Sequence, residues 1–408
     1  MVYKLSREKR ELAKGIYLST AYCIFLTGLK MNGAGAEKII FTSVMLLSFY
    51  FLAVNFYRKF NKEGLKSFSL YYVVLFTLII IYGVITSLRD LTFNNKLLTL
   101  FGNPYAAFAW LVPVVFIYAH DPENLLVLNK ISITLIKIAT FASPVLLLVD
   151  KDLGVSSLYW LTCLYFVPFF TWKYQKSADK KWIIIGVILF LVYSYLDSVR
   201  TGFVQVAMHG LCFGLLTVLG LMGKGVMGKL KALLLVVTSV VLFITLMYKM
   251  DDIMASFSQQ DKTDTRSFLY VEVFEDLTKT EELTFGKGPL GKYYSDYFFN
   301  LQKNAPAENG DAADRLTVEV GFLEMLLKGG WVMAVLFFMI CIPAVIQSIF
   351  FSKNIMARGL GLYGLCYLVI LFILNIPMYS NVYIVFWIIM GLCASRKFRN
   401  IEEKSLSI

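Results

Sequence analysis

Charged and histidine side chains are scarce in this sequence, and their scarcity excludes most soluble and metal-dependent classes of protein. Only 16% of the 408 residues are charged and only 2 are histidine, whereas 58% are hydrophobic. A soluble domain needs a polar surface, so this composition excludes one. The 6 cysteines lie in apolar stretches, and no Cys or His pair has metal-ligand spacing. We therefore predict no disulfide framework and no metal site, in an all-α polytopic membrane protein.

Apolar runs recur along the chain, each about 17 to 22 residues long, which is the length a helix needs to cross about 30 Å of hydrocarbon. They divide the chain into an N-terminal bundle of about nine transmembrane helices (1–248), a large hydrophilic loop (249–330), and about three C-terminal transmembrane helices with a tail (331–408). The predicted spans, about twelve in number, are 14–31, 39–57, 69–88, 101–119, 127–149, 153–172, 182–198, 202–222, 230–248, 331–351, 358–376 and 380–395.

The distribution of basic residues predicts how the bundle is oriented. Short connections that hold 23 of the 39 Lys and Arg alternate with connections that hold few. Because Lys and Arg are retained on the cytoplasmic side, both termini are expected in the cytoplasm and residues 249–330 outside. That loop is acidic, with 15 Asp or Glu against 9 Lys or Arg. The net charge of +11 thus reflects topology, and no basic, aromatic-interleaved module indicates nucleic acid binding.

Arg200 is the first candidate site residue. It follows an apolar run, in Asp197-Ser198-Val199-Arg200-Thr201-Gly202, at the external mouth of the predicted bundle. A guanidinium group presents a fixed fork of donors that suits phosphate or carboxylate. An intrahelical ion pair with Asp197, three residues earlier, explains the same residue equally well.

Arg266 is the second candidate, at the start of a segment with apolar residues at helical spacing, namely Phe268, Val271, Phe274 and Leu277. With Asp264 or Thr265 as the N-cap, Arg266 would lie in the first turn of an amphipathic helix. The helix dipole disfavours a cation there by up to about 1 kcal/mol. An anionic ligand or a carboxylate partner would explain the arginine, and the alternative is a solvated side chain.

The apolar stretch 320–351, at about 32 residues, is too long for one perpendicular crossing. Because Gly329-Gly330 interrupts it, we predict a helix that descends to the membrane surface, followed by a full crossing. Glu319 would lie near the top of the first helix, either as a candidate base or as an acid that complements the helix dipole. Upstream, the glycine-rich run Phe285-Gly286-Lys287-Gly288-Pro289-Leu290-Gly291 predicts a tight turn, because no strand-turn-helix pattern surrounds it.

The whole chain resembles the O-antigen polymerase and O-antigen ligase superfamily, whose members have eleven to fourteen spans and one large external loop near the C-terminal third. Three degenerate local elements are also similar to the family's, and their order and topology carry the resemblance. They are Asp197-Ser198-Val199-Arg200-Thr201, Arg266-Ser267-Phe268-Leu269-Tyr270 with the glycine turn after it, and the helix 321–330 that ends in glycine. The ligase branch commonly opens that last helix with a histidine–asparagine pair. Glu319-Val320 stands there in this chain, which favours the polymerase branch.

This resemblance implies an enzyme of the bacterial cytoplasmic (inner) membrane that extends O-antigen or capsule repeats. Arg200 and Arg266 would hold the pyrophosphate of a glycan donor linked to undecaprenyl pyrophosphate, so the reaction would need no cofactor, metal ion or nucleotide sugar. A hydroxyl group of a second lipid-linked repeat unit would attack the anomeric carbon, with Glu319 as the general base. The further substrate-binding candidates are Arg315, for the pyrophosphate or the glycan, and Tyr270, Tyr293 and Tyr294, for sugar faces.

Two other functions compete with the polymerase. An O-antigen ligase would transfer the finished glycan to lipid A core. A lipid-linked oligosaccharide flippase also has about twelve spans, but such exporters have short loops and polar residues at the membrane midplane, unlike this chain. A chain-length regulator and a flippase are the protein partners that the polymerase reading implies.

Overall fold

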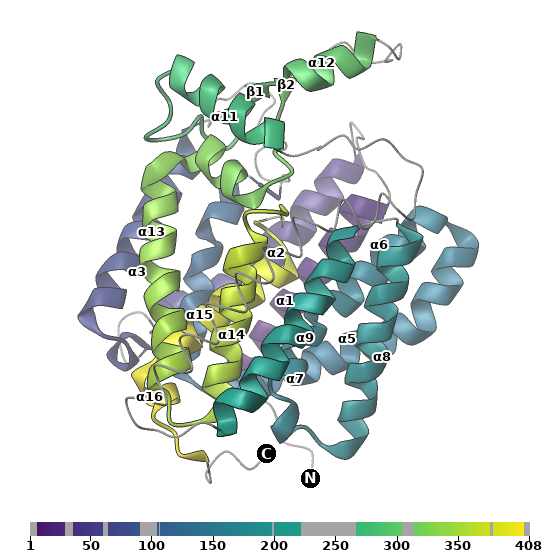
Figure 1. Ribbon diagram of the computed structural model, residues 1–408, viewed down its shortest axis with the longest axis vertical. Helices are drawn as coiled ribbons and strands as arrows, with labels where there is room; N and C mark the ends of the chain where they lie inside the picture. The colour runs from purple at the N-terminus through teal and green to yellow at the C-terminus, as the bar shows by residue number, and fades with distance from the viewer. Residues whose placement is uncertain are drawn as a thin grey trace.

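The computed structural model describes residues 6–28, 36–59, 64–89, 104–105, 107–197, 200–221, 267–303, 314–375 and 378–403. These residues form a helical bundle with one two-stranded sheet at its end (Figure 1). We call residues 267–303 and 314–320 the cap, and the end of the bundle that carries them the cap end. The cap consists of α11 (Ser267–Lys279), β1 (Tyr293–Tyr294), α12 (Asp296–Lys303) and β2 (Asp314–Arg315).

The N-terminal part of the bundle packs helix against helix around α6. The first helix α1 lies against α2 and α6, α5 lies against α6 and α8, and α8 lies against α9. Three single-turn 3₁₀ segments, Gly64–Ser67, Cys163–Tyr165 and Trp172–Tyr174, connect longer elements. The longer elements are α1 (Arg7–Gly28), α2 (Ala36–Lys59), α3 (Leu70–Leu88), the 3₁₀ helix η2 (Ala107–His120), α5 (Asn124–Val149), α6 (Lys151–Thr162), α7 (Phe166–Phe170), α8 (Ser177–Leu196) and α9 (Arg200–Leu221).

The C-terminal part places the most buried helix in the molecule's interior. It comprises α13 (Gly321–Phe351), α14 (Ile355–Ile370), α15 (Asn381–Ala394) and α16 (Arg396–Arg399). Every residue of α15 is buried, against η2, α13 and α14. The side-chain amide of Asn381 donates to the Thr20 hydroxyl and to the Trp160 carbonyl oxygen, each at 2.9 Å. These bonds satisfy a buried polar group and tie α15 to α1 and α6.

Four helical segments of the described chain are long and apolar enough to cross a membrane: Leu70–Leu88, Asn124–Val149, Lys151–Phe170 and Gly321–Phe351. Described helical segments overlap, in whole or in part, eleven of the twelve predicted spans, and the remaining one, 230–248, lies outside the described residues. The number of segments that cross a membrane stays a prediction. Large apolar side chains project from α3 and α5 into solvent, among them Phe141, which is 72% exposed, and Leu148, which is 89% exposed. Such surface suits contact with lipid tails.

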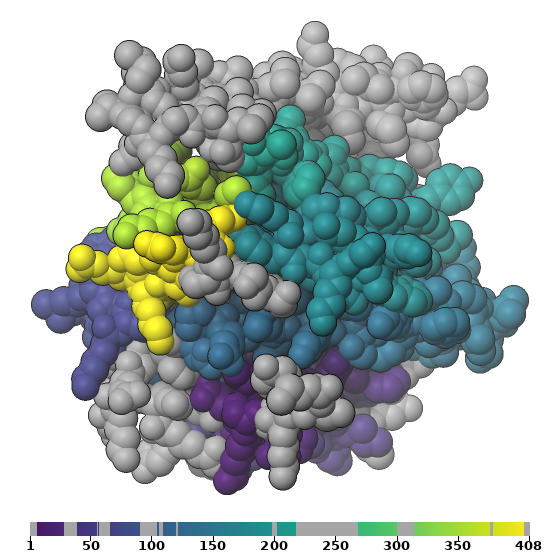
Figure 2. Space-filling view, turned by 90° about the horizontal axis from the view of Figure 1, so that it is seen from below, coloured from purple at the N-terminus to yellow at the C-terminus, as the bar shows by residue number. Residues whose placement is uncertain are grey.

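The tail end of the bundle lies opposite the cap and carries α16 (Figure 1). There the Glu403 carboxylate accepts from the Lys173 ammonium at 2.7 Å and from the Ile355 amide at 3.0 Å. At the same end, Lys9 near the start of α1 pairs with Glu123. Viewed from this end, the C-terminal residues in yellow lie between the green segment that contains α13 and the teal and blue segments (Figure 2). Both ends of the described chain therefore lie on the same side of the bundle.

The long helix α13 breaks at the predicted place. Its 31 residues would extend about 46 Å as a continuous helix, but Gly330 has a φ of 62° and a ψ of −169°. Residues of the cap bind the carbonyl groups that this break leaves free. The Lys287 amide donates to the Leu327 carbonyl oxygen at 2.7 Å, and the Gly288 amide donates to that of Lys328 at 3.0 Å. The glycine-rich run thus forms the predicted turn, and it caps a helix end.

Close backbone contact explains the glycines on both sides of this junction. Beyond the break, the Trp331 amide donates to the Leu283 carbonyl oxygen at 3.1 Å. A Cβ atom on Gly330 would lie 2.3 Å from the Thr284 carbonyl oxygen. Gly286 has a φ of 68°, and a Cβ atom there would lie 2.5 Å from the backbone of Lys328. Any larger residue at these two glycines would therefore push the cap away from α13.

The amphipathic helix predicted after Arg266 is present as α11, but its buried stripe differs from the predicted one. Leu269, Val273 and Leu277 are each 0% exposed, whereas Val271 is 59% exposed. This i, i+4, i+8 stripe faces β1 and the first half of α13. Val271 therefore does not belong to the buried face of this helix, as its helical spacing with the other apolar residues had suggested. The buried face runs through Leu269, Val273 and Leu277 instead.

Candidate functional site

A cavity of about 350 Å³ opens where several helices end at the cap end of the bundle. Thr27 lines it from the end of α1, and Asp152 lines it from the start of α6. Asp197, directly after α8, and Gly202, at the start of α9, complete this side of the opening. We call this cavity the mouth pocket. Its position at helix ends places polar side-chain groups around it.

Two carboxylates and two amides make the mouth pocket polar. Asp152 is exposed in the first turn of α6, behind the N-cap Asp150, whose carboxylate accepts from a backbone amide at 2.9 Å. Asp197 is exposed at the C-cap of α8. Gln205 and Asn375 are half-buried and line the same pocket. Carboxylates only accept hydrogen bonds whereas amides also donate, so this lining suits a ligand rich in hydroxyl groups.

Aromatic side chains form the deeper wall of the mouth pocket. Trp160 and Phe190 line it at 3% and 1% exposure, and the half-buried Tyr159 and Tyr193 lie closer to the opening. The Tyr159 ring centroid lies 4.6 Å from that of Trp160 and 4.8 Å from that of Tyr193. The Tyr193 hydroxyl donates to the Asp197 carboxylate at 3.1 Å, which joins the aromatic wall to the polar rim. Aromatic walls with a few placed polar groups are typical of small-molecule sites.

Gly202 allows the two helices at the rim to approach closely. A Cβ atom on Gly202 would lie 1.9 Å from the Ser194 hydroxyl oxygen on α8. Arg200 is the first residue of α9, so its backbone stands at this rim, but its side chain lies outside the described residues. Asp197 and Arg200 do not share one helix, because α8 ends at Leu196 and α9 begins at Arg200, and any pairing of their side chains lies outside the described residues.

Asn375 connects the mouth pocket to the cap. Its backbone amide donates to the Glu319 carbonyl oxygen at 2.9 Å, and its side-chain amide donates to the Val318 carbonyl oxygen at 2.6 Å. Glu319 lies directly before Val320, the N-cap of α13, and so stands just outside the start of that helix. Its side chain is 48% exposed, 3.7 Å from the Arg315 guanidinium. An ion pair this exposed contributes little to stability, and it leaves the Glu319 carboxylate accessible.

The other predicted substrate-binding residues lie in different environments within the cap. The Arg315 guanidinium lies 3.7 Å from the ring centroid of Phe298, and the Tyr270 hydroxyl donates to the Phe372 carbonyl oxygen at 2.7 Å. Tyr294 is 44% exposed, whereas Tyr293 is 1% exposed, and burial raises the pKa of Tyr293. The expectation that Tyr293 stacks on a sugar is therefore wrong, because its ring packs inside the cap. Arg266, the remaining candidate, lies outside the described residues.

Sequence reasoning missed a buried pair that positions this part of the cap. Glu324 and Lys328 are both 0% exposed in the first half of α13. The Glu324 carboxylate accepts from the Val318 amide at 2.7 Å, and the Lys328 ammonium donates to the Leu316 carbonyl oxygen at 2.5 Å. They hold the segment between Arg315 and Glu319. The signal was two opposite charges at i, i+4 spacing in an otherwise apolar helix.

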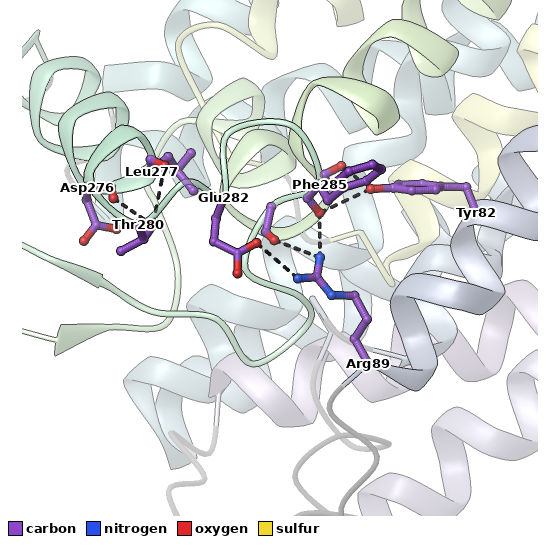
Figure 3. A network of polar contacts seen from close by, with 9 residues as sticks. Tyr82, Arg89, Asp276, Leu277, Thr280, Glu282 and Phe285 are labelled. Carbon is purple, nitrogen blue, oxygen red and sulfur yellow. Dashed lines mark hydrogen bonds and ion pairs between the residues drawn. The ribbon is translucent and has the colours of Figure 1, made fainter.

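A second missed residue, Arg89, fastens the glycine turn to the bundle (Figure 3). From the end of α3, its guanidinium donates to the carbonyl oxygens of Phe285 and Gly286 at 2.7 Å and 2.8 Å, and to the Glu282 carboxylate at 3.2 Å. The Tyr82 hydroxyl, from the same helix, donates to the Phe285 carbonyl oxygen at 3.2 Å. The signal was that Arg89 is one of the few basic residues in the predicted external short connections.

Comparison of the chain with protein-family models, curated proteins and solved structures finds no match. Within the described ranges, no three His, Cys, Asp or Glu residues are grouped so that they could hold a metal ion. The class of protein defined by the fold is thus a helical protein with apolar helices suited to a membrane.

Proposed function

We propose that this protein is a polysaccharide polymerase of the bacterial cytoplasmic membrane, with twelve spans and both termini in the cytoplasm. It would transfer a glycan from undecaprenyl pyrophosphate to the non-reducing end of a second lipid-linked repeat unit, without a metal ion. In this topology residues 249–330 lie outside the cytoplasm. The observation that carries the proposal is the mouth pocket, whose size, aromatic wall and hydroxyl-matching rim fit a sugar ring.

The position of the mouth pocket supports a reaction on lipid-linked glycans. The pocket lies at the cap end, opposite the end that holds the two ends of the described chain. With cytoplasmic termini, it opens toward the outer leaflet, where the isoprenoid tail of a lipid-linked sugar can enter between helices. A flippase would instead need polar groups along a path through the membrane, whereas the mouth pocket lies at one end of the bundle.

The proposed chemistry uses cations at the rim and a carboxylate at the cap. Arg200, at the start of α9, and Arg266, next to α11, would bind the donor pyrophosphate and stabilise its charge as it leaves. The acceptor hydroxyl oxygen forms a bond to the anomeric carbon while the bond from that carbon to the pyrophosphate oxygen breaks. The electron pair departs with undecaprenyl pyrophosphate, and the hydroxyl proton passes to Glu319. A single displacement of this kind inverts the anomeric configuration.

The direct test is incubation of the purified protein with a defined undecaprenyl-pyrophosphate-linked repeat unit, with product length read on a gel. A ladder of multiples is expected. Products of one unit only, or transfer only when lipid A core is added, would refute the polymerase and, in the second case, favour a ligase. Glu319→Gln should slow the ladder by at least about 100-fold, because a general base contributes that much or more.

Glu275→Gln provides the matched control for Glu319→Gln. Glu275 is 59% exposed and pairs with Lys279 four residues away, as Glu319 pairs with Arg315. Both substitutions remove one charge from an exposed i, i+4 pair in the cap, so a general electrostatic effect would appear in both. Unchanged polymerisation by Glu275→Gln together with loss in Glu319→Gln assigns the effect to Glu319. Equal activity of the two variants would remove Glu319 from the mechanism.

A further inference from the structure

We infer that the tail end of the bundle carries a binding site for the phosphate of an anionic phospholipid, built around the Arg399 guanidinium. The site lies where α16 meets the last turns of α13 and the start of α3, at the opposite end from the mouth pocket (Figure 1). It goes beyond the proposed function and does not depend on it, because no residue of the mouth pocket or the cap takes part.

The backbone around Arg399 is held firmly against the bundle. Phe398, the residue before it, is 1% exposed, and its carbonyl oxygen accepts from the Asn354 side-chain amide at 3.0 Å. The Lys353 amide donates to the Arg399 carbonyl oxygen at 2.8 Å. From this backbone the Arg399 side chain reaches α13, where its Nη2 donates to the Gln347 Oε1 at 2.8 Å. The guanidinium therefore lies against α13 instead of extending into solvent.

The Arg399 guanidinium carries a charge that no described carboxylate balances. Arg399 is half-buried, and no Asp or Glu of the described ranges forms an ion pair with it. Its Nε atom is buried and has no hydrogen-bond partner in this part of the chain. Burial lowers the pKa of Arg399, and the nearby charge of Arg396 also lowers it. A desolvated charge costs free energy unless an opposite charge and hydrogen bonds replace the water it loses. An anion beside Arg399 would supply both.

A second polar group without a partner lies near Arg399. The Tyr72 hydroxyl, in the first turn of α3, is buried and has no hydrogen-bond partner among the described residues. It lies close enough to the Arg399 guanidinium to interact with it electrostatically. A hydroxyl group donates one hydrogen bond, and a guanidinium group presents a fork of donors that matches an oxyanion. A phosphate group has several acceptor oxygens, so one phosphate can satisfy both side chains.

The surface around these donors indicates a lipid as the source of the phosphate. Leu70 and Tyr71, directly before Tyr72, are 77% and 42% exposed. Phe351, one turn beyond Gln347, is 56% exposed. Because α3 and α13 are long and apolar enough to cross a membrane, these ends of the two helices lie at a membrane boundary. Anionic headgroups attract arginine there, and a free phosphate ion would leave the apolar side chains uncovered.

The test titrates the purified full-length protein in detergent with phosphatidylglycerol or with phosphatidylcholine of the same acyl chains, and native mass spectrometry counts the bound lipids. Phosphatidylglycerol should bind at least about tenfold more tightly, because its headgroup has a net negative charge. Arg399→Gln should weaken phosphatidylglycerol binding at least about tenfold, since hydrogen bonds to a charged group are lost, and should leave phosphatidylcholine binding unchanged. Tyr72→Phe keeps the packing of the ring and should weaken phosphatidylglycerol binding about threefold.

Arg396→Gln is the matched control for Arg399→Gln. Arg396 is exposed in the same short helix, so the same substitution there removes the same charge without touching the bond to Gln347. An exposed charge contributes little, and phosphatidylglycerol binding should weaken about twofold at most. An equal loss in the two variants would show general charge attraction and overturn the site.

The competing ligands are tested on the same preparation. Equal affinity for the two lipids would overturn the site, because nothing would then select the anionic headgroup. Displacement of phosphatidylglycerol by an equal concentration of inorganic phosphate would assign the donors to a free ion, and displacement by a polyglutamate peptide would assign them to an acidic protein segment. Circular dichroism checks that each variant is folded. If Arg399→Gln does not fold, unchanged phosphatidylglycerol binding in Tyr72→Phe would overturn the site.

Discussion

The two ends of the helical bundle use acidic side chains in different ways. At the tail end, Glu403 and Glu123 pair with Lys173 and Lys9 and hold the two ends of the described chain against the helices. At the cap end, Asp152 and Asp197 line a cavity of about 350 Å³. Carboxylates thus fasten structure at both ends, as Glu282 and Glu324 do in the cap, and at the cap end two further carboxylates line a cavity. The cavity with its aromatic wall is the arrangement suited to a ligand.

The cap end also differs in how its surface segments are attached. The side chains of Arg89, Lys328 and Tyr82 donate hydrogen bonds to backbone carbonyl oxygens there. Such an attachment depends on these three donor side chains, and not on the side chains of the residues whose carbonyl oxygens accept. The closest backbone contacts of the cap are made at glycine residues. The cap is therefore fastened both to the end of α3 and to the break in α13. Four substitutions test this contrast between the ends.

Arg200→Ala should have the largest effect. Polymerisation should fall by at least about 100-fold, since removing one group that stabilises developing charge typically costs that much. Arg266→Ala should do the same, and Arg200→Lys should restore little because the guanidinium fork is lost. Arg7→Ala is the control at the tail end, where Arg7 is 71% exposed and pairs with Glu11. Full activity in Arg200→Ala, measured at equal protein level, would remove Arg200 from the mechanism.

Gly330→Ala should have the second largest effect, on stability at the cap end. The left-handed φ of 62° and a Cβ atom 2.3 Å from the Thr284 carbonyl oxygen both oppose a side chain. We expect the free energy of unfolding to fall by about 2 to 4 kcal/mol, and thermal denaturation of the purified protein measures this loss. Gly210→Ala is the matched control, because no atom lies within 4 Å of its Cβ position. A Gly330→Ala variant as stable as Gly210→Ala would show that the junction tolerates separation of the cap.

The sequence was sufficient for the features that depend on local pattern. Apolar run length located the helices, and Gly329-Gly330 in an overlong run predicted the break in α13. The helix α11 followed from apolar spacing, although which face it buries depended on β1 and α13, which lie apart from it in the sequence.

The mouth pocket could not be predicted from the sequence, because it is assembled from distant segments. Asp152 and Asp197 are ordinary helix-end acids when considered alone, and Asn375 gains its position only by bonding to Glu319 across the chain. Tyr293 failed as a sugar-stacking residue for a similar reason, since only the packing of the cap shows that its ring is buried. Local pattern predicts elements, whereas the site depends on which element ends meet.

Arg89→Lys should have a smaller and local effect at the cap end. It keeps the charge but loses the fork, in which Nη1 donates to the carbonyl oxygens of Phe285 and Gly286 while Nη2 donates to the Glu282 carboxylate. Hydrogen exchange of the turn should quicken as its opening becomes easier by about 1.5 to 3 kcal/mol, the range for hydrogen bonds to a charged group. Exchange in α15 should remain as it was. Unchanged exchange in the turn would show that the glycine contacts alone hold it.

Glu403→Gln should have the smallest effect, confined to the tail end. Partial burial alone would raise the pKa of Glu403, but hydrogen bonds from Lys173, Tyr174 and the Ile355 amide outweigh it and lower the pKa below the usual 4.5. A lowered pKa means that the contact stabilises the protein fully above pH 4.5 and loses this contribution as the pH falls through the pKa in the folded state. The contribution is below about 1 kcal/mol because the pairing is solvent-exposed.

Proteolysis of the tail should therefore be faster in Glu403→Gln at pH 7. In the unmodified protein it should become faster only as the pH falls below 4.5. Polymerisation by Glu403→Gln at pH 7 should stay unchanged. A loss of polymerisation at pH 7 in this variant would mean that the tail end also serves the reaction, and the contrast between the two ends would fail.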